Sequence, residues 1–446
     1  MSMSLGRRLL LAFYSALLWL LVPVTLYHLV WRGLRQREYL LRWSERYAQL
    51  DALPDLPPGA IWVHAVSVGE VNAAVPLVNA LRARYPERPL LVTTITPTGS
   101  ARVRALWGDA VQHVYLPYDL HGMVQRFLRR VRPALAVVIE TELWPNLFVA
   151  CARADVPVVI ANARLSERSL RGYRWMGPLI RLALSGVRLV AAQSEADAAR
   201  FRVLAGDGVR IEVTGNLKFD QPLPQATREE ALGWRRACGV RPTWIAASTH
   251  SDEEEAVLEA HRRLRDTHPD ALLLWAPRHP ERFDAVADRV LGAGLALCRR
   301  SVERAPDSHC AVFLIDTLGE LPGFLAAGDV AFVGGSLVPV GGHNTLEPAA
   351  LGVPVLSGPH TFNFVELTAL LKDVGALETV GDAKELSSAV AWLWAHPDQA
   401  RARGRAGRQR IDRERGGLAR TLDLIESLGI TSSRRDPLPR PPSAGG

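Results

Sequence analysis

The sequence predicts an α/β protein with two Rossmann-like domains that face each other across a cleft, preceded by an N-terminal membrane helix. Short apolar runs alternate with amphipathic segments of helix length, which is typical of parallel βαβ units. The alternation is interrupted once, near residues 216–242, and then restarts, which indicates two such domains. N-terminal to this alternating pattern, residues 9–31 contain no Asp, Glu, Lys or Arg, which indicates a membrane segment.

As a helix, residues 9–31 are long enough to cross a hydrocarbon core of roughly 30 Å. A cleaved signal peptide is the alternative, but no small-x-small cleavage site precedes the Arg-rich run that follows. The basic flanking residues are Arg7, Arg8, Arg32, Arg35, Arg37, Arg42 and Arg46. Because the C-terminal flank is the more basic one, the positive-inside rule places the rest of the chain in the cytoplasm. Pro23 and His28 weaken the span and leave open a helix lying in the membrane interface. Residues 1–50 are therefore expected to form the anchor and its basic flank.

Residues 51–215 are expected to form the first Rossmann-like domain. Its strands are short, apolar runs of the kind that parallel sheets bury, at 61–66, 90–95, 135–139, 157–161, 188–193 and 210–215. Segments between them, such as 71–84 and 120–131, have helical apolar spacing. Ligands of open parallel sheets bind beyond the carboxyl ends of the strands, so functional residues are expected in the loops that follow them.

Residues 216–428 are expected to form the second Rossmann-like domain. It opens with a Pro-rich and charge-rich linker, 216–242, and its strands are expected at 243–248, 271–276, 311–315, 329–335 and 354–358. Segments 383–395 and 398–428 are expected to be helical. The tail, 429–446, has low complexity and is expected to be disordered.

The composition narrows the function classes. The chain has 446 residues, of which 48% are hydrophobic, and a formal charge of +7. The basic residues form no stripe interleaved with aromatic residues, so a nucleic acid is not an expected partner, whereas a membrane surface or an anionic substrate fits the charge. The four cysteines, Cys151, Cys238, Cys298 and Cys310, form no C-x-x-C pair, which argues against a disulfide framework and a Cys-ligated zinc site.

Two expected strand ends of the first domain carry carboxylates. Glu70 follows the first strand in the run HAVSVGE, at the start of a helix. It is interpreted as a general base, although a carboxylate that only stabilises the helix start remains an alternative. Glu140 and Glu142 directly follow the strand at 135–139, and an extended chain would place them on the same side. Solvated acids at a helix start are the alternative reading there.

The linker contributes Lys218, in the run GNLKFD. It is one of three lysines among 53 basic residues, so its presence in an Arg-rich chain suggests a need for a compact point charge. Chance survival of a lysine at this position is the alternative.

The second domain carries a set of candidate anion and nucleotide contacts. Arg278 and His279 follow a strand and precede a helix that opens at Pro280, an arrangement that suits a phosphate. The run Leu318, Gly319 and Glu320 follows the next strand and turns into a helix.

The run HNTLEP, near the end of a glycine-rich loop, opens a further helix with Asn344, Thr345, Leu346 and Glu347. The Glu347 carboxylate can accept hydrogen bonds from both hydroxyls of a ribose. Neither a dinucleotide-binding motif nor a P-loop motif is found, so oxidoreductases and P-loop enzymes are disfavoured.

Taken together and in order, the motifs HAVSVGE, ETELWPN, GNLKFD, APRHPERF and GGHNTLEPA resemble the Kdo transferases of lipopolysaccharide synthesis. The resemblance runs from the anchor to about residue 425 and departs from the family at Thr345, where the family usually has Pro. It implies the GT-B glycosyltransferase fold and transfer of Kdo (3-deoxy-D-manno-oct-2-ulosonic acid) from CMP-Kdo. The implied acceptor is the tetraacylated lipid A precursor, at the cytoplasmic face of the inner membrane.

The resemblance also implies roles for individual residues. Glu70 is implied as the catalytic base, and Glu140 and Lys218 as groups that stabilise the transition state. The implied CMP contacts are Arg278, His279, Leu318, Gly319, Glu320, Asn344, Thr345, Leu346 and Glu347. A single displacement with inversion is expected, with no cofactor and, because the second half lacks a DxD-like carboxylate pair, no obligate metal. Two alternatives remain: another membrane-associated GT-B enzyme with a different nucleotide sugar, and a membrane-tethered binding protein without activity.

Overall fold

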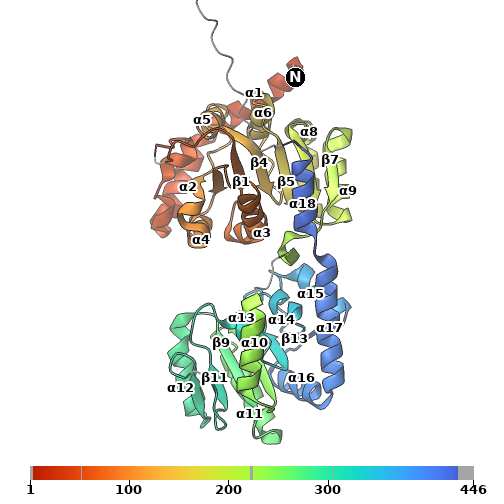
Figure 1. Ribbon diagram of the computed structural model, residues 1–446. Helices are drawn as coiled ribbons and strands as arrows, with labels where there is room; N and C mark the ends of the chain where they lie inside the picture. The colour runs from red at the N-terminus through yellow and green to blue at the C-terminus, as the bar shows by residue number, and fades with distance from the viewer. Residues whose placement is uncertain (1–3, 52, 221–224, 304, 430–446) are drawn as a thin grey trace, which may run out of the picture. The chain divides into compact units, whose positions relative to one another are not determined.

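Two seven-stranded parallel sheets form the framework of the protein, one in each of two units, in this computed structural model (Figure 1). The structure describes residues 4–51, 53–220, 225–303 and 305–429. The first unit comprises Met1–Gln221 together with Arg415–Gly446, and the second comprises Pro222–Glu414. The two parallel α/β units agree with the fold class that the sequence predicts.

The first sheet has the strand order β3-β2-β1-β4-β5-β6-β7. Its strands are β1 (Ala60–His64), β2 (Leu90–Thr94), β3 (Gln112–Tyr115), β4 (Pro133–Ile139), β5 (Val158–Ala163), β6 (Val187–Ala192) and β7 (Arg210–Val213). Apolar side chains from α5 (His121–Val131), α6 (Pro145–Arg153), α8 (Gly177–Leu184) and α9 (Glu195–Ala205) cover one face. The other face is covered by α3 (Val68–Arg84), α4 (Pro97–Trp107) and α18 (Gly417–Glu426). A further helix, α7 (Glu167–Trp175), follows β5.

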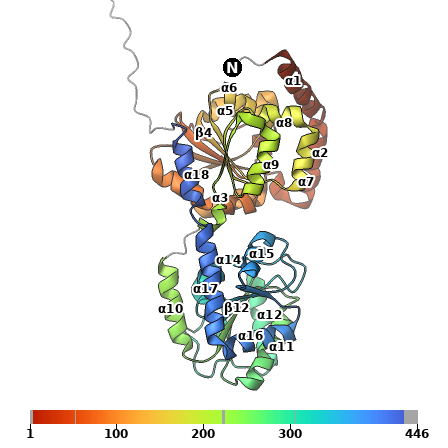
Figure 2. The same ribbon diagram turned by 90° about the vertical axis from the view of Figure 1, so that its right-hand side faces the viewer.

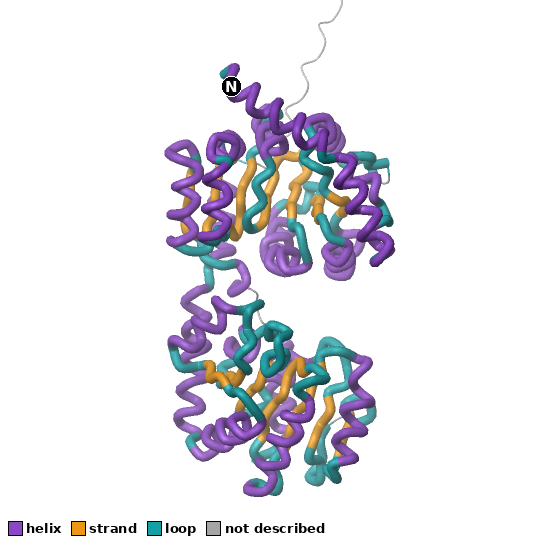
Figure 3. The backbone as a smooth tube through the Cα atoms, turned by 180° about the vertical axis from the view of Figure 1, so that it is seen from behind, coloured by secondary structure: helices purple, strands orange, loops and turns teal. Residues whose placement is uncertain are grey.

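The second sheet has the strand order β10-β11-β9-β8-β12-β13-β14. Its strands are β8 (Thr243–Thr249), β9 (Leu272–Pro277), β10 (Leu297–Arg299), β11 (Val312–Leu314), β12 (Val330–Val333), β13 (Val355–Ser357) and β14 (Leu377–Thr379). Helices α11 (Glu254–Thr267), α12 (Phe283–Gly292), α16 (Ala383–Ala395) and α17 (Pro397–Glu414) pack on one face. Helices α10 (Gln225–Cys238) and α13 (Leu321–Leu325) pack on the other. Two more helices, α14 (Leu346–Ala350) and α15 (Val365–Asp373), complete this unit. Within each unit the strands lie between layers of helices (Figure 3).

All the strands named from the sequence are present, whereas β3, β10 and β14 were not anticipated. These three strands lie at sheet edges, have only three or four residues each and carry polar side chains. Two other expectations need correction. The linker at 216–242 contains the helix α10, whose Cys238 is buried against the second sheet. The segment 398–428 forms two helices, α17 and α18, because Gly416 between them has a φ of +94°.

The chain returns to the first unit for its last helix, α18, although the sequence assigned residues up to 428 to the second domain (Figure 1). The Asp220 carboxylate accepts hydrogen bonds from the backbone N–H groups of Gly416 and Leu418, at 2.6 and 2.7 Å. Leu422 and Ile425 complete the apolar layer against α3. The start of α18 is therefore fixed to the turn that follows the first sheet. Of the expected disordered tail, residues 430–446 lie outside the described residues.

The N-terminal apolar stretch forms two helices, α1 (Leu5–Leu20) and α2 (Val22–Arg35), instead of one (Figure 2). Over the described ranges, no single helix is both long and apolar enough to cross a membrane. Only α1 and α2 together, with a bend of 44° between them, have the length and composition of a membrane span. The break precedes Pro23, which the sequence marks as a weak point of the span.

One face of α1 is docked on the first unit. Leu11 is buried with Val149 of α6 and Leu182 of α8. The Tyr14 hydroxyl donates to Asp119 Oδ2 at 3.0 Å, and the Ser15 hydroxyl donates to Asn146 Oδ1 at 3.0 Å. These three α1 residues share one helix face because they are separated by three or four positions.

Part of the basic flank is used inside the first unit. Arg46 is 3% exposed, donates to the Ile95 carbonyl at 2.7 Å and lies 4.3 Å from the centre of the Tyr115 ring. Arg42 forms an ion pair with Glu45. These two arginines have structural partners, so the flank offers fewer free positive charges to a membrane than the sequence suggests.

Candidate active site

Glu70 lies in the first turn of α3, just beyond the carboxyl end of β1. Its carboxylate turns back toward the strand, where Oε2 accepts a hydrogen bond of 2.7 Å from the Val66 backbone N–H. Burial, with a smaller contribution from the negative charges of Glu140 and Glu142, raises the pKa of Glu70 to about 7, while the hydrogen bond from Val66 opposes the rise. A carboxylate with a pKa near neutrality is suited to accept a proton during a reaction.

Glu140 and Glu142 lie beyond the end of β4, the neighbour of β1 in the sheet. Glu140 has a φ of +61°, so the chain does not stay extended there and the alternation argument for these two side chains does not apply. The two carboxylates are nevertheless close enough to interact. Burial and the negative charge of Glu140 together raise the pKa of Glu142 to about 7. Glu70, Glu140 and Glu142 therefore form a carboxylate cluster at the carboxyl edge of the first sheet.

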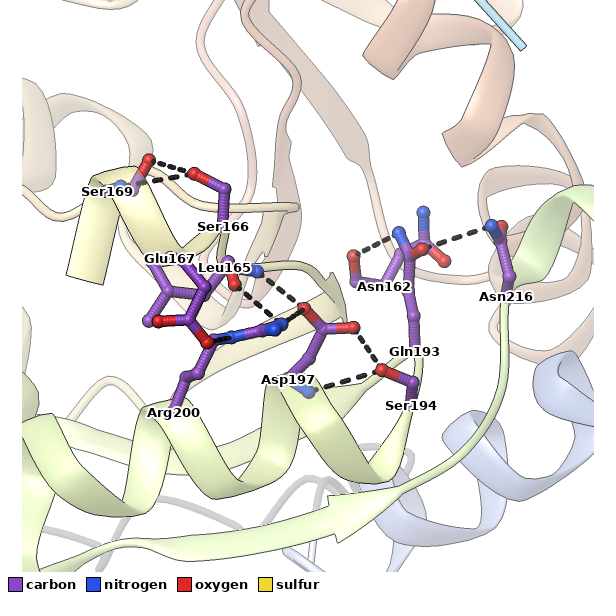
Figure 4. A network of polar contacts seen from close by, with 10 residues as sticks. All are labelled: Asn162, Leu165, Ser166, Glu167, Ser169, Gln193, Ser194, Asp197, Arg200 and Asn216. Carbon is purple, nitrogen blue, oxygen red and sulfur yellow. Dashed lines mark hydrogen bonds and ion pairs between the residues drawn. The ribbon is translucent and has the colours of Figure 1, made fainter. Parts of the chain in front are cut away.

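Lys218 lies in the short turn Leu217–Asp220, which packs against α3, and its side chain is exposed. An amide network fixes this turn, as Figure 4 shows. Asn162 Oδ1 accepts from the Leu217 N–H at 3.0 Å, and Asn162 O accepts from Gln193 Nε2 at 3.0 Å. Gln193 Oε1 in turn accepts from Asn216 Nδ2 at 3.1 Å. The backbone that carries Lys218 is thus held at the ends of β5 and β6.

Figure 4 also shows a second network beside it, centred on Asp197. Asp197 Oδ1 accepts from the Leu165 N–H at 2.8 Å, and the Ser194 hydroxyl donates to Oδ2 at 2.5 Å. Arg200 donates to the Leu165 carbonyl and to Glu167. These contacts fix the loop between β5 and α7, next to the amide network.

In the second unit, Arg278 and His279 directly follow β9 and their side chains are exposed. The Arg278 N–H donates to the Thr249 carbonyl at 3.0 Å, which extends the pairing of β9 with β8 by one residue. The guanidinium is thus held at the carboxyl edge of the second sheet by the backbone, while its donors stay accessible.

Leu318, Gly319 and Glu320 lie in the loop after β11, the other neighbour of β9. Gly319 has a φ of +87°, which favours glycine, and Leu318 is 76% exposed. The Glu320 carboxylate accepts from Arg300 at 2.8 Å and from the Thr317 hydroxyl. Glu320 therefore has one partner in its own loop and one in the loop after β10, and the exposed groups here are Leu318 and the backbone.

Asn344, Thr345, Leu346 and Glu347 follow β12 and open the helix α14. Asn344 Oδ1 accepts from the Leu346 N–H at 3.1 Å, and Asn344 Nδ2 donates to Glu347 Oε1 at 3.0 Å. Burial raises the pKa of Glu347, and the bond from Asn344 opposes that rise. The Thr345 side chain is buried, and among the described residues its hydroxyl has no hydrogen-bond partner.

The sequence interpretation missed the groups that organise this edge. Glu253 is 1% exposed and accepts hydrogen bonds from the N–H groups of His250, Gly335, Ser336 and Leu337. His250 and His343 contact each other through their Nε2 atoms, which are 2.9 Å apart. The run THSDEE contains both His250 and Glu253, but no sequence spacing links it to residues more than 80 positions away.

A metal-binding cluster of three or more His, Cys, Asp or Glu side chains is absent from the part of the chain that the structure describes. All four cysteines are buried and free.

Comparison with known proteins identifies the family. The sequence model of a family described as 3-Deoxy-D-manno-octulosonic-acid transferase (kdotransferase) matches residues 41–221. The chain is 41% identical over 423 residues to a 3-deoxy-D-manno-octulosonic acid transferase from Haemophilus influenzae, covering 93% of this chain and 97% of that protein. It is 40% identical over 409 residues to the protein of the same name from Bordetella pertussis, covering 89% and 94%.

Among solved structures, UDP-GlcNAc 2-epimerase from Neisseria meningitidis bound to UDP-GlcNAc has a TM-score of 0.51 at 14% identity, covering 83% of this chain and 100% of that one. At this identity the likeness concerns the fold alone. The two relatives, in contrast, match this chain over nearly its whole length and theirs. The chain therefore belongs to the 3-deoxy-D-manno-octulosonic-acid transferase family, a family of glycosyltransferases.

Proposed function

We propose that this protein transfers Kdo from CMP-Kdo to the tetraacyldisaccharide 4′-phosphate precursor of lipid A, by a single displacement that inverts the anomeric configuration. The observation that carries the proposal is Glu70, a carboxylate with a pKa of about 7 at the end of β1 in a chain of this family. In the proposed step Glu70 takes the proton of the sugar hydroxyl of the acceptor as that oxygen attacks the anomeric carbon. Glu140 and Lys218 are proposed to stabilise charge in the transition state.

The second unit is proposed to bind the CMP portion of the donor. Arg278 and His279 are proposed to donate hydrogen bonds to the phosphate. The backbone of Leu318, Gly319 and Glu320 is proposed to contact the cytosine ring. Asn344 to Glu347 are proposed to hold the ribose, with the Glu347 carboxylate accepting hydrogen bonds from the ribose hydroxyls. Arg278 and the neighbouring N–H groups would stabilise the charge that develops on the departing phosphate.

The helices α1 and α2 are proposed to attach the protein to the cytoplasmic face of the inner membrane, where the lipid acceptor resides. The α1 face opposite Leu11, Tyr14 and Ser15 carries Leu9, Phe13 and Leu20, which are 61%, 71% and 76% exposed. The single-pass arrangement expected from the sequence would require α1 to leave its contacts with α6 and α8, because these helices belong to the folded unit. An in-plane position keeps the contacts with Asp119 and Asn146 and still places the apolar face in lipid.

The first prediction concerns Glu70→Gln, which keeps the shape of the side chain and removes the base. Turnover of CMP-Kdo with the lipid acceptor should fall by roughly two orders of magnitude or more, because general-base catalysis contributes about that much. CMP affinity, measured by calorimetry, should remain unchanged. Glu87→Gln, at an exposed position of the same unit, is the matched control. Full turnover in Glu70→Gln would show that Glu70 is not the base.

The second prediction concerns the pH dependence. Because the base must be deprotonated, kcat/KM should rise with pH through an apparent pKa of about 7 and level off above it. Glu142→Gln removes a like charge that raises the pKa of Glu70, so the rising limb should move to lower pH by a few tenths of a unit. In the control Glu87→Gln, the rising limb of the kcat/KM profile should stay at the same pH. If the limb also stays there in Glu142→Gln, Glu70 and Glu142 are not electrostatically coupled.

The third prediction concerns Arg278→Ala. CMP affinity should weaken by about 1.5–3 kcal/mol, the scale of a hydrogen bond to a charged group. The melting temperature should hardly change, because the backbone N–H of residue 278 still bonds to Thr249. Arg262→Ala, at an exposed position of α11, should change neither quantity. An unchanged CMP affinity with a large drop in melting temperature would make Arg278 structural.

The fourth prediction concerns the membrane. Replacing Leu9, Phe13 and Leu20 together by Ser should lower binding to lipid vesicles at high salt at least tenfold, since each buried apolar side chain contributes roughly 1.5–3 kcal/mol. The fold should persist because these side chains point away from the unit. Val240→Ser, in the second unit, is the control, at an apolar residue that is even more exposed. Vesicle binding that survives the triple change would exclude this face as the membrane contact.

A further inference from the structure

The carboxyl edge of the second sheet holds three histidines, of which the proposed reaction uses only His279. His250 follows β8, His279 follows β9, and His343 lies in the loop after β12. These strands are neighbours in the order β9-β8-β12, so their ends meet at one edge. The His250 and His343 rings are nearly parallel, with an interplanar angle of 7°, and their centroids are 5.1 Å apart. The His279 ring meets His250 edge-on at the same separation of 5.1 Å.

The surrounding backbone forces His250 and His343 together. The buried Glu253 carboxylate accepts from the N–H of His250 and from the N–H groups at 335–337, which ties the β8 loop to the β12 loop. The Gly342 N–H donates to the Gly335 carbonyl at 2.7 Å, which folds the loop back so that His343 covers Gly335. A Cβ atom on Gly335 would lie 2.9 Å from the His343 ring, and the φ of +66° there also favours glycine.

A hydrogen bond between two Nε2 atoms restricts the protons that the pair can hold. One ring must donate its Nε2 proton and the other must accept with a lone pair, so the two rings together are neutral or carry a single positive charge. Burial lowers the pKa of both rings, that of His343 to about 4, and the nearby charges of Arg278 and His279 act in the same direction. On the β8 side, Glu253 and Asp252 oppose this effect at His250. In the free protein near neutral pH the pair is therefore uncharged.

We propose that His250 and His343 form a proton-holding pair for the donor phosphate, which takes up one proton when the phosphate binds beside Arg278 and holds it while the sugar leaves. This inference rests on the proposed function, since the donor there is a phosphodiester. A bound phosphate brings negative charge beside the pair and offsets the positive charge of Arg278, which together with burial lowers the pKa of both rings. Protonation of the pair then becomes favourable at neutral pH.

The reaction step balances with this proton in place. The bond between the anomeric carbon and the phosphate oxygen breaks, and its electron pair stays on that oxygen. The acceptor oxygen forms the new bond to the anomeric carbon and loses its proton to Glu70. The phosphate passes from one negative charge to two, and the positive charge on the pair stabilises the second one. The pair releases its proton when CMP leaves.

Proton uptake upon CMP binding tests the proposal directly. Calorimetric titration of the full-length protein at pH 7.5, in two buffers with different heats of ionisation, gives the number of protons taken up per CMP bound. We expect uptake approaching one proton for the wild type with CMP, and none with cytidine, which lacks the phosphate. His343→Gln and His250→Gln each keep a polar side chain that does not titrate, so uptake should be lost in both. His309→Gln, at an exposed position of the same unit, should retain it.

The outcomes separate this proposal from the proposed function. CMP binding to the wild type without proton uptake would overturn the pair and leave the donor assignment intact. Uptake that persists in a folded His343→Gln or His250→Gln protein would also overturn it, because the proton would then reside elsewhere. Absence of CMP binding to the wild type would overturn the proposed function and, with it, this inference.

Discussion

The structure depends first on the parallel direction of every strand within each sheet. Parallel pairing brings the carboxyl ends of all strands in a sheet to one edge, however far apart they lie in the sequence. Glu70 and Glu140 follow neighbouring strands of the first sheet in this way, and Arg278 and Asn344 follow strands of the second that are both paired with β8. Residues that are 60 to 70 positions apart thereby meet at one sheet edge in each unit.

The loops at these edges are held by buried polar side chains, because a buried N–H group without a partner costs about 1–3 kcal/mol. The Glu253 carboxylate accepts hydrogen bonds from four such N–H groups. The Asn162 side chain accepts one from the N–H of Leu217, in the turn that carries Lys218. Backbone strain accumulates in the same places, since Glu140, Asn162 and Ser248 have positive φ values at or next to strand ends. The cores supply the stability that allows such conformations at the site.

The sequence predicts the central strands well, because a strand buried on both faces reads as an apolar run. The motif residues follow these strands as expected, and their roles stay predictions. The sequence does not predict β3, β10 or β14, because these three edge strands are short and include polar side chains, so they do not read as apolar runs. It also misses the contact of His250 with His343, which depends on two loops 93 positions apart and on the folding of one over Gly335. The apolar pattern of residues 9–31 likewise cannot show that Tyr14 and Ser15 bond to the folded unit.

The proposed function requires that a lipid acceptor attacks the sugar of CMP-Kdo in this protein. Its most direct test is mass spectrometry of the lipid after the purified full-length protein has been incubated with CMP-Kdo and the tetraacylated lipid A precursor in detergent. We expect a lipid that has gained Kdo, with one CMP released for each Kdo transferred. Release of CMP with free Kdo and no glycosylated lipid, or transfer only from a uridine-based donor, would contradict it.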